Sequence, residues 1–231
     1  FPQQLKGIAM VNVDDVQVGV KELERCAKMG LVGAMIACFP LDGQSYGSPD
    51  FDPLWAASQD LNMPLSFHAA TNRTTSMKVA QFGHPFLINM DFWARMCFSE
   101  MILRGVFERY PKLQVGAVEF ELGWIPHFLN RIDYAYTQRP SPEDKIRFKN
   151  GMVPSDFFHR NIFLSFQEDA KGVQDRHIIG VDNLMWGADY PHFESTFPRS
   201  QQIIEEILVD CTEEEKDKIV GGNTARVYHL D

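Results

Sequence analysis

The chain has 231 residues, of which 45% are hydrophobic and 23% charged, a composition typical of a globular protein with a sizeable core. Its formal net charge of −9 argues against a nucleic-acid surface and against anionic membranes, so we expect neither partner. The longest apolar stretch, residues 30–40, is too short to span a bilayer. No CxxC pattern joins the four cysteines, and a chain of this length needs no disulfides, which favours reduced thiols and a cytoplasmic protein.

Strand-like and helix-like segments alternate along the chain. The six strand candidates are residues 5–11, 31–39, 64–68, 113–119, 161–166 and 183–186. Between them, helices are expected from Asp14 or Asp15 to Gly30, from 52 (with Asp52 as the N-cap) to 62, from 91 to 110, and from 124 towards 136. Two more helices close the chain, and the second begins with a capping box at Thr212.

This alternation predicts a parallel sheet covered by helices, either a barrel or a doubly wound sheet. Neither GxGxxG nor GxxxxGK[ST] occurs, which favours the barrel. A barrel needs eight strands and only six are found, and residue 1 is Phe rather than Met. We therefore predict one domain over residues 1–231, a (β/α)₈ TIM barrel of the metal-dependent hydrolase type that lacks its first two β/α units. Its sheet should be open between residues 5–11 and 183–186, and the exposed edges should promote aggregation.

Polar residues stand at the ends of three predicted strands. His68 ends the third strand, Glu119 ends the fourth, and Asp189 follows the sixth, so all three should meet at one face of a barrel. Imidazole and carboxylate groups suit zinc or a similar divalent ion. Each residue also has a structural alternative: a buried histidine bonded to backbone, a glutamate paired with an arginine, and an aspartate that caps a turn beside a solvated His192. We expect Glu121 to be a solvated carboxylate at a helix start.

Four segments together resemble the amidohydrolase-related family, in the branch that contains amino-carboxymuconate-semialdehyde decarboxylase and γ-resorcylate decarboxylase. They are PLSFH at 64–68, VEFELGWIP at 118–126 with Arg131 and Asp133, WGADYPH at 186–192 and GNTARVY at 222–228. The resemblance spans nearly the whole chain and implies a distorted (β/α)₈ barrel whose third strand is residues 5–11. The family's first strand, which carries a His-x-His or acid-x-His metal pair, has no counterpart in this sequence.

The resemblance also implies roles for single residues. His68 matches the family's metal-binding histidine, and Asp189 matches its metal-adjacent aspartate, which also handles a proton. Glu119 stands, after a one-residue shift, where several members have histidine and others glutamate, which implies a catalytic role. His192 follows Asp189 in a D-[FY]-P-H pattern and would contact substrate. Asn223 with Tyr228 resembles a structural packing motif.

We therefore predict a metal-dependent, non-oxidative decarboxylase, a carbon-carbon lyase that acts on an aromatic or muconate-type carboxylic acid. The divalent metal ion, zinc or else manganese, would be bound by His68 and Asp189, and Asp189 would deliver the proton. Arg73 or His84 would hold the carboxylate of a small-molecule substrate, unless both belong to a flexible loop. We also expect a homo-oligomer, a dimer.

Two alternatives remain open at this stage. The same site would suit a hydrolase, in which a metal-activated water attacks a small carbonyl substrate and Asp189 accepts the proton. The chain would instead be a non-catalytic barrel fragment without metal if His68 and Asp189 are its only ligands, because catalytic zinc usually has three.

Overall fold

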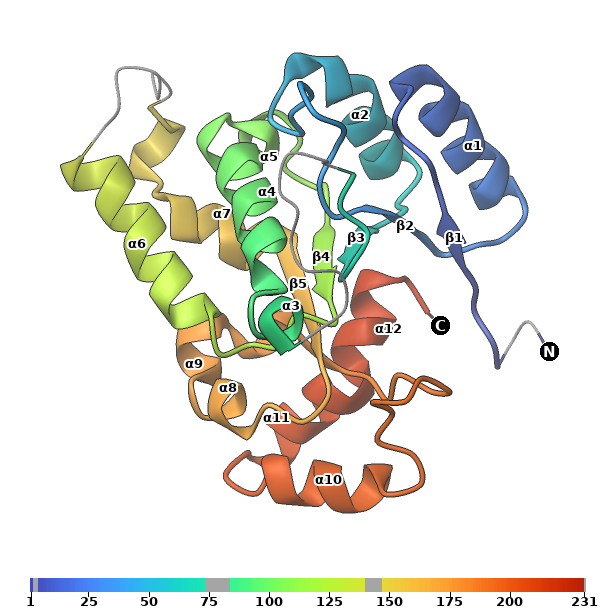
Figure 1. The fold of residues 1–231 in the computed structure, drawn as a ribbon, viewed down its shortest axis with the longest axis vertical. Helices are drawn as coiled ribbons and strands as arrows, with labels where there is room; N and C mark the ends of the chain where they lie inside the picture. The colour runs from blue at the N-terminus through green and yellow to red at the C-terminus, as the bar shows by residue number, and fades with distance from the viewer. Residues whose placement is uncertain (2–3, 74–83, 140–146, 231) are drawn as a thin grey trace.

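The computed structural model describes residues 1, 4–73, 84–139 and 147–230. Six parallel strands form one sheet in which spatial order equals chain order (Figure 1). They are β1 (Ile8–Met10), β2 (Gly33–Ala37), β3 (Leu65–His68), β4 (Val115–Val118), β5 (Ile162–Phe166) and β6 (Leu184–Trp186). Every strand lies within its predicted range.

The sheet is open at both ends. Within the described part of the chain, β1 pairs only with β2, and β6 pairs only with β5. Ile8 and Met10 on β1 are accordingly 47% and 77% exposed. The α/β class and the partial-barrel arrangement predicted from the sequence are therefore confirmed.

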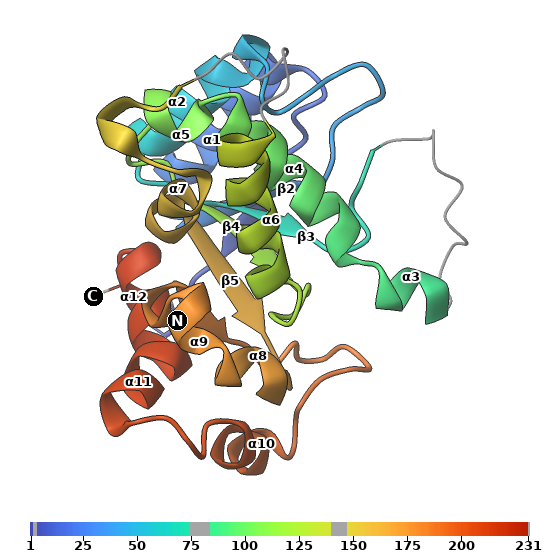
Figure 2. The same ribbon diagram turned by 90° about the vertical axis from the view of Figure 1, so that its left-hand side faces the viewer.

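Helices connect the strands and cover the outer side of the sheet (Figure 2). The longer ones are α1 (Val16–Lys28), α2 (Asp52–Asp60), α4 (Asp91–Leu103), α6 (Ile125–Gln138), α7 (Pro154–Asn161) and α10 (Ser200–Ile207). The shorter ones are η1 (Pro49–Phe51), α3 (His84–Ile88), α5 (Val106–Arg109), η2 (Lys149–Gly151), α8 (Ala170–Gln174), α9 (Arg176–Ile179), η3 (Val181–Asn183), α11 (Glu213–Asp217), η4 (Lys218–Gly222) and α12 (Asn223–Val227). None of the helices in the described ranges is long and apolar enough to cross a membrane.

Two helix boundaries follow the predicted capping residues. The Asp15 carboxylate accepts hydrogen bonds from the amides of Gln17 and Val18, and so caps α1. In the predicted box before α11, the Thr212 hydroxyl accepts from the Glu215 amide while the Glu215 carboxylate accepts from the Thr212 amide.

Two other helix predictions are wrong. Asp52 does not cap α2, because Ser48 caps the preceding turn η1 and Asp52 instead forms an ion pair with Arg109 at 2.8 Å. The helix predicted over 91–110 is broken into α4 and α5 at Gly105, whose φ of 71° is left-handed and ends the helical path. No helix was predicted from the sequence at α7, which begins at Pro154.

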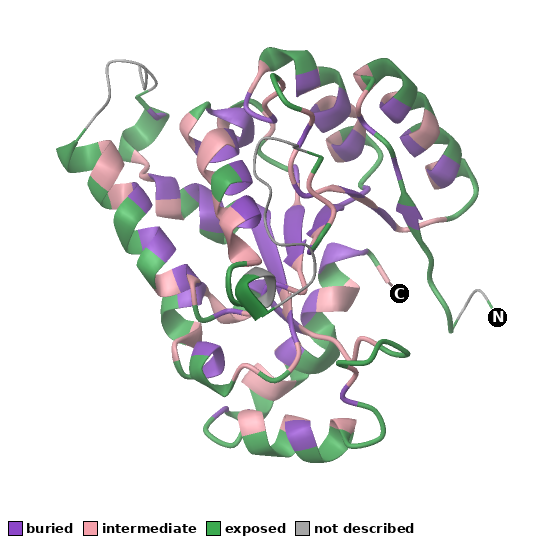
Figure 3. Cartoon of the chain, in the orientation of Figure 1, coloured by how far each residue is buried: buried purple, intermediate pink, exposed green. Residues whose placement is uncertain are grey.

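The core lies between the sheet and its outer helices (Figure 3). Its largest fully buried side chains are aromatic, and Tyr46 stacks on Phe67 of β3 with ring centroids 5.6 Å apart. Trp55 of α2 meets the edge of the same Tyr46 ring. Burial of such rings supplies most of the driving force that holds helices onto a sheet.

A smaller apolar cluster lies on the opposite, inner face of the sheet. Phe163 of β5 lies over Gly116 of β4, where any added Cβ would come within 2.0 Å of the ring. Tyr228, just after α12, packs on Phe163 and closely approaches Gly33 of β2. The Tyr228 ring therefore covers the inner side of strands that are far earlier in the chain.

Three buried asparagines tie the amino ends of the later strands together. The Asn161 amide donates to the carbonyls of Pro111 and Leu113, and Asn183 donates to His159 and Ile162. The Asn223 amide donates to Val181 and Leu184, which supports the structural role expected for it. Each side chain satisfies carbonyl groups that the short strands leave unpaired.

We predict that Asn161→Ala destabilises the chain by about 2 kcal/mol, because two buried carbonyls lose their donor. Urea unfolding followed by circular dichroism measures the change. The matched control is Asn130→Ala on the exposed side of α6, which should stay within about 0.5 kcal/mol of the parent. Equal midpoints for the two variants would contradict the proposed tie.

Candidate active site

The predicted site residues converge at the carboxyl ends of the strands. His68 is the last residue of β3 and is in register with Val118, the last residue of β4. Glu119 follows Val118 directly, and Asp189 lies three residues beyond the end of β6. Since neighbouring parallel strands end at one edge of the sheet, the three side chains share that edge.

His68 is oriented by a backbone carbonyl and faces Glu119. Its Nδ1 lies 2.8 Å from the carbonyl oxygen of Ala69. A carbonyl can only accept, so this contact places a proton on Nδ1. The other nitrogen, Nε2, lies 3.0 Å from Oε1 of Glu119. The hydrogen bond to Glu119 raises the pKa of His68 despite the opposing effect of burial.

The contacts continue from Glu119 through Asp189 to His192. Burial works to raise the pKa of Glu119, but the bond and charge of His68 outweigh it, so the pKa is lowered. Burial and the hydrogen bond with Glu119 raise the pKa of Asp189. The pKa values of these two neighbouring carboxyl groups are therefore shifted in opposite directions. Nδ1 of His192 lies 2.9 Å from Oδ2 of Asp189.

Both carboxylate residues adopt left-handed backbone conformations. The φ angles are 64° at Glu119 and 51° at Asp189, a region that non-glycine residues rarely occupy. Behind Asp189 the loop folds back on itself, since the Ser195 hydroxyl and the Thr196 amide both donate to the Ala188 carbonyl. Left-handed residues of this kind cluster at functional sites, where the surroundings hold them in place.

The nitrogen and oxygen atoms of this site are of the kinds that bind divalent ions. The proton on Nδ1 leaves Nε2 of His68 as the nitrogen that would bind a metal in exchange for its contact with Glu119, as in metal sites where a backbone carbonyl orients the imidazole. Oδ2 of Asp189 is buried and accepts no well-aligned hydrogen bond, although His192 is close to it. Among the residues that the structure describes, however, no three His, Cys, Asp or Glu side chains are arranged to hold a metal. His68 and Asp189 by themselves would be a partial ligand set.

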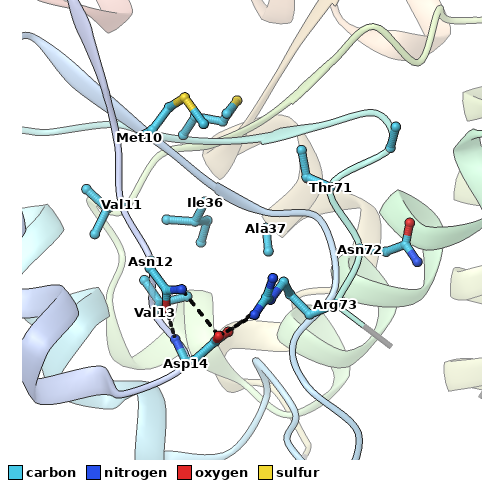
Figure 4. Close-up of a pocket in the computed structure, with 12 residues that line it drawn as sticks. Met10, Val11, Asn12, Val13, Asp14, Ile36, Ala37, Thr71, Asn72 and Arg73 are labelled. Carbon is cyan, nitrogen blue, oxygen red and sulfur yellow. Dashed lines mark hydrogen bonds and ion pairs between the residues drawn. The ribbon is translucent and has the colours of Figure 1, made fainter. Parts of the chain in front are cut away.

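Arg73 lies beside the site but is already paired. Its guanidinium forms an ion pair of 2.6 Å with Asp14, which Asn12 also contacts (Figure 4). These residues line a cavity of about 400 Å³ at the ends of β1, β2 and β3. Thr71 connects the cavity to the site, because its hydroxyl donates to the His68 carbonyl and accepts from the Cys38 amide.

The structure does not bring His84 into this set of contacts. It is the exposed first residue of α3, and no hydrogen bond joins it to His68, Glu119 or Asp189. Residues 74–83, which join Arg73 to His84, lie outside the described residues.

Two acidic residues beside the site were not identified from the sequence. Glu121 is not the solvated carboxylate that we expected: it is partly buried, and burial raises its pKa to about 7. Its Oε2 lies 3.4 Å from the amide nitrogen of Gln167, which follows β5. Asp169, in the same loop, accepts hydrogen bonds from the amides of Leu122 and Gly123. Asp169 could have been found from the sequence, because it is a carboxylate that lies three residues after a predicted strand.

A partial parallel barrel with imidazole and carboxylate groups at its strand ends is typical of metal-dependent barrel enzymes. The model of the amidohydrolase family matches residues 1–230. The chain belongs to this family.

Two of its relatives are named as decarboxylases. The γ-resorcylate decarboxylase of Polaromonas sp. is 25% identical over all of this chain and 72% of its own length. The 2-amino-3-carboxymuconate-6-semialdehyde decarboxylase of Dictyostelium discoideum is 24% identical over all of this chain and 62% of its own length. The chain thus spans between 62% and 72% of these relatives. The branch predicted from the sequence is confirmed.

Two solved structures share the fold. The 5-carboxyvanillate decarboxylase of Sphingomonas paucimobilis has a TM-score of 0.77 and 25% identity, over 98% of this chain and 67% of that one. A dihydroxybenzoic acid decarboxylase of Polaromonas sp., solved with bound manganese and 2-nitroresorcinol, has a TM-score of 0.77 and 21% identity, over 97% of this chain and 69% of that one.

We predict that Glu121→Gln increases stability at high pH only. Because the pKa of Glu121 is raised from 4.5 to about 7 in the folded chain, the native state keeps a proton that the unfolded state releases. Wild-type stability therefore falls as pH rises from about 4.5 to about 7, by up to about 3 kcal/mol, and the glutamine variant escapes this loss. Urea unfolding of both proteins at pH 4.5 and pH 8 measures it. A variant whose advantage is the same at both pH values would contradict the assignment.

Proposed function

We propose that this site catalyses the metal-dependent, non-oxidative decarboxylation of an aromatic or muconate-type carboxylic acid. The observation that carries the proposal is the continuous row of contacts from His68 through Glu119 and Asp189 to His192 at the mouth of the partial barrel. The names of the decarboxylase relatives support the same reaction class.

A divalent ion, zinc or manganese, belongs to the proposal. His68 through Nε2 and Asp189 through its buried Oδ2 would bind it as part of its ligand set. When bound, such an ion orients a carboxylate substrate and stabilises developing negative charge. The manganese in the Polaromonas structure supports a divalent metal, and imidazole with carboxylate would suit either ion.

The protein residues would supply the proton. When the bond between the substrate carbon and CO₂ breaks, its electron pair stays on that carbon and takes the proton from the Asp189 carboxyl group. Glu119, which lies against Asp189, would accept a hydrogen bond from the protonated carboxyl group and hold it in place. His192, about half exposed beside Asp189, would contact the substrate. Water then restores the proton on Asp189.

Arg73 remains the proposed residue for a substrate carboxylate, because its cavity is connected to His68 through Thr71. His84 keeps the same proposed role from the sequence alone. The homodimer and the cytoplasmic location also stay predictions; the four buried, unpaired cysteines support the latter.

We predict that the chain, incubated with Mn²⁺ or Zn²⁺ and 2,6-dihydroxybenzoate in ¹⁸O-labelled water, releases CO₂ and forms resorcinol that carries no label. Mass spectrometry of both products measures this. Labelled oxygen in the organic product would instead support the hydrolase alternative. No turnover of any aromatic or muconate-type acid with either metal would support the non-catalytic alternative.

We predict different effects for two substitutions. His68→Ala should lose both bound metal and turnover, because the ligand nitrogen is removed. Asp189→Asn should lower turnover about a hundredfold or more, yet retain weak metal binding, because an amide coordinates weakly but cannot transfer this proton. Calorimetric titration with Mn²⁺ and the product assay separate the two effects, and His127→Ala on the exposed side of α6 is the control. Near-normal turnover of Asp189→Asn would remove it from the mechanism.

A further inference from the structure

We infer that Asp169 is a positioning residue, which holds the loop after β4 so that Glu119 stays against His68 and Asp189. The inference rests on the proposed function, since it concerns a residue of that site. It starts from the backbone of the loop, where Glu119 and Glu121 have φ angles of 64° and 51°. Two left-handed residues so close together relax to other conformations unless their surroundings hold them.

Asp169 supplies that restraint from the neighbouring loop. Its Oδ2 accepts hydrogen bonds from the amides of Leu122 at 2.8 Å and Gly123 at 2.7 Å. Its Oδ1 accepts from the Gly172 amide at 2.7 Å and so caps α8. One side chain thus fixes the loop after β4 to the start of the helix that follows β5. Hydrogen bonds from backbone amides to a carboxylate are about twice as strong as neutral ones.

Close packing and a second hydrogen bond also hold the loop after β4 against the loop after β5. A Cβ at Gly172 would come within 2.3 Å of Leu122, so the helix approaches the loop as closely as glycine allows. Phe120 is almost fully buried between the left-handed residues. Glu121 adds a contact from the loop after β4 to the loop after β5. Its carboxyl group accepts a hydrogen bond from the Gln167 amide in the same loop as Asp169. The segment from Glu119 to Gly123 is therefore held at several points.

This restraint matters for chemistry because Glu119 is the central member of the row of contacts. A shift of the loop would move Oε1 of Glu119 away from Nε2 of His68, from which it is 3.0 Å distant. Displacement of a catalytic group by about 1 Å can cost a hundredfold in rate. A merely structural Asp169 would instead change stability without acting through Glu119.

The decisive variant is Asp169→Ser. A serine hydroxyl still caps α8 at Gly172 but is too short to reach the amides of Leu122 and Gly123. Turnover should fall about ten- to a hundredfold with little change in KM. The control is Asp175→Asn at the other end of α8, which should leave turnover unchanged. Should Asp169→Ser fail to fold, Asp169→Asn, which keeps both the size and the cap, carries the same test.

A double-mutant cycle distinguishes positioning from stability. In a Glu119→Gln background, Asp169→Ser should cause no further loss of turnover, because the residue that it positions is already inactive. A loss that adds in full to that of Glu119→Gln would overturn the inference.

A measurement that needs no turnover separates this inference from the proposed function. Amide hydrogen exchange of Leu122 and Gly123 should become faster in Asp169→Ser, and a crystal structure should show His68 and Glu119 farther apart than 3.0 Å. Both changes in a chain without decarboxylase activity would reject the proposed function and retain the restraint. Unchanged exchange and an unchanged His68 to Glu119 distance would overturn the restraint itself.

Discussion

The parallel pairing of six successive strands is the constraint on which the rest of the molecule depends. Because each strand lies beside the next one in the chain, every connection returns along the outside of the sheet, and every loop that follows a strand emerges at the same edge. The row from His68 to His192 is assembled by this rule from the end of β3, the loop after β4 and the loop after β6. The outer helices pack on the outward-facing side chains of the strands. This burial fixes the register that pairs His68 with Val118 at the end of β4.

Most of the fold could be predicted from local sequence signals. Buried parallel strands are continuous apolar runs, so all six were found, and Asp15 and Thr212 mark helix starts by a chemistry that acts within a few residues. The errors in helix boundaries arose where a residue distant in the sequence determines the local structure. Asp52 has the sequence of a cap but pairs with Arg109, which lies on a different helix. The break at Gly105 depends on how α4 and α5 pack, and an isolated glycine in a helical pattern does not reveal that.

The position of the candidate site could be predicted from the sequence, but the contacts between its side chains could not. Strand ends identify His68, Glu119 and Asp189, because the carboxyl ends of parallel strands meet at one edge of the sheet. The contact between His68 and Glu119 follows from a left-handed turn at Glu119 that no pattern of residue types announces. The ion pair of Arg73 with Asp14 likewise joins two loops that only the folded sheet brings together.

The position of Tyr228 has a consequence for synthesis on the ribosome. Its ring packs on the inner face of the sheet against Phe163 and Gly33, yet it is synthesised after all six strands. A growing chain can pair β1 to β5 and cover their outer side well before that ring emerges from the exit tunnel. During this interval the Phe163 ring lacks its contact with Tyr228, and apolar surface exposed in this way favours contacts with other chains.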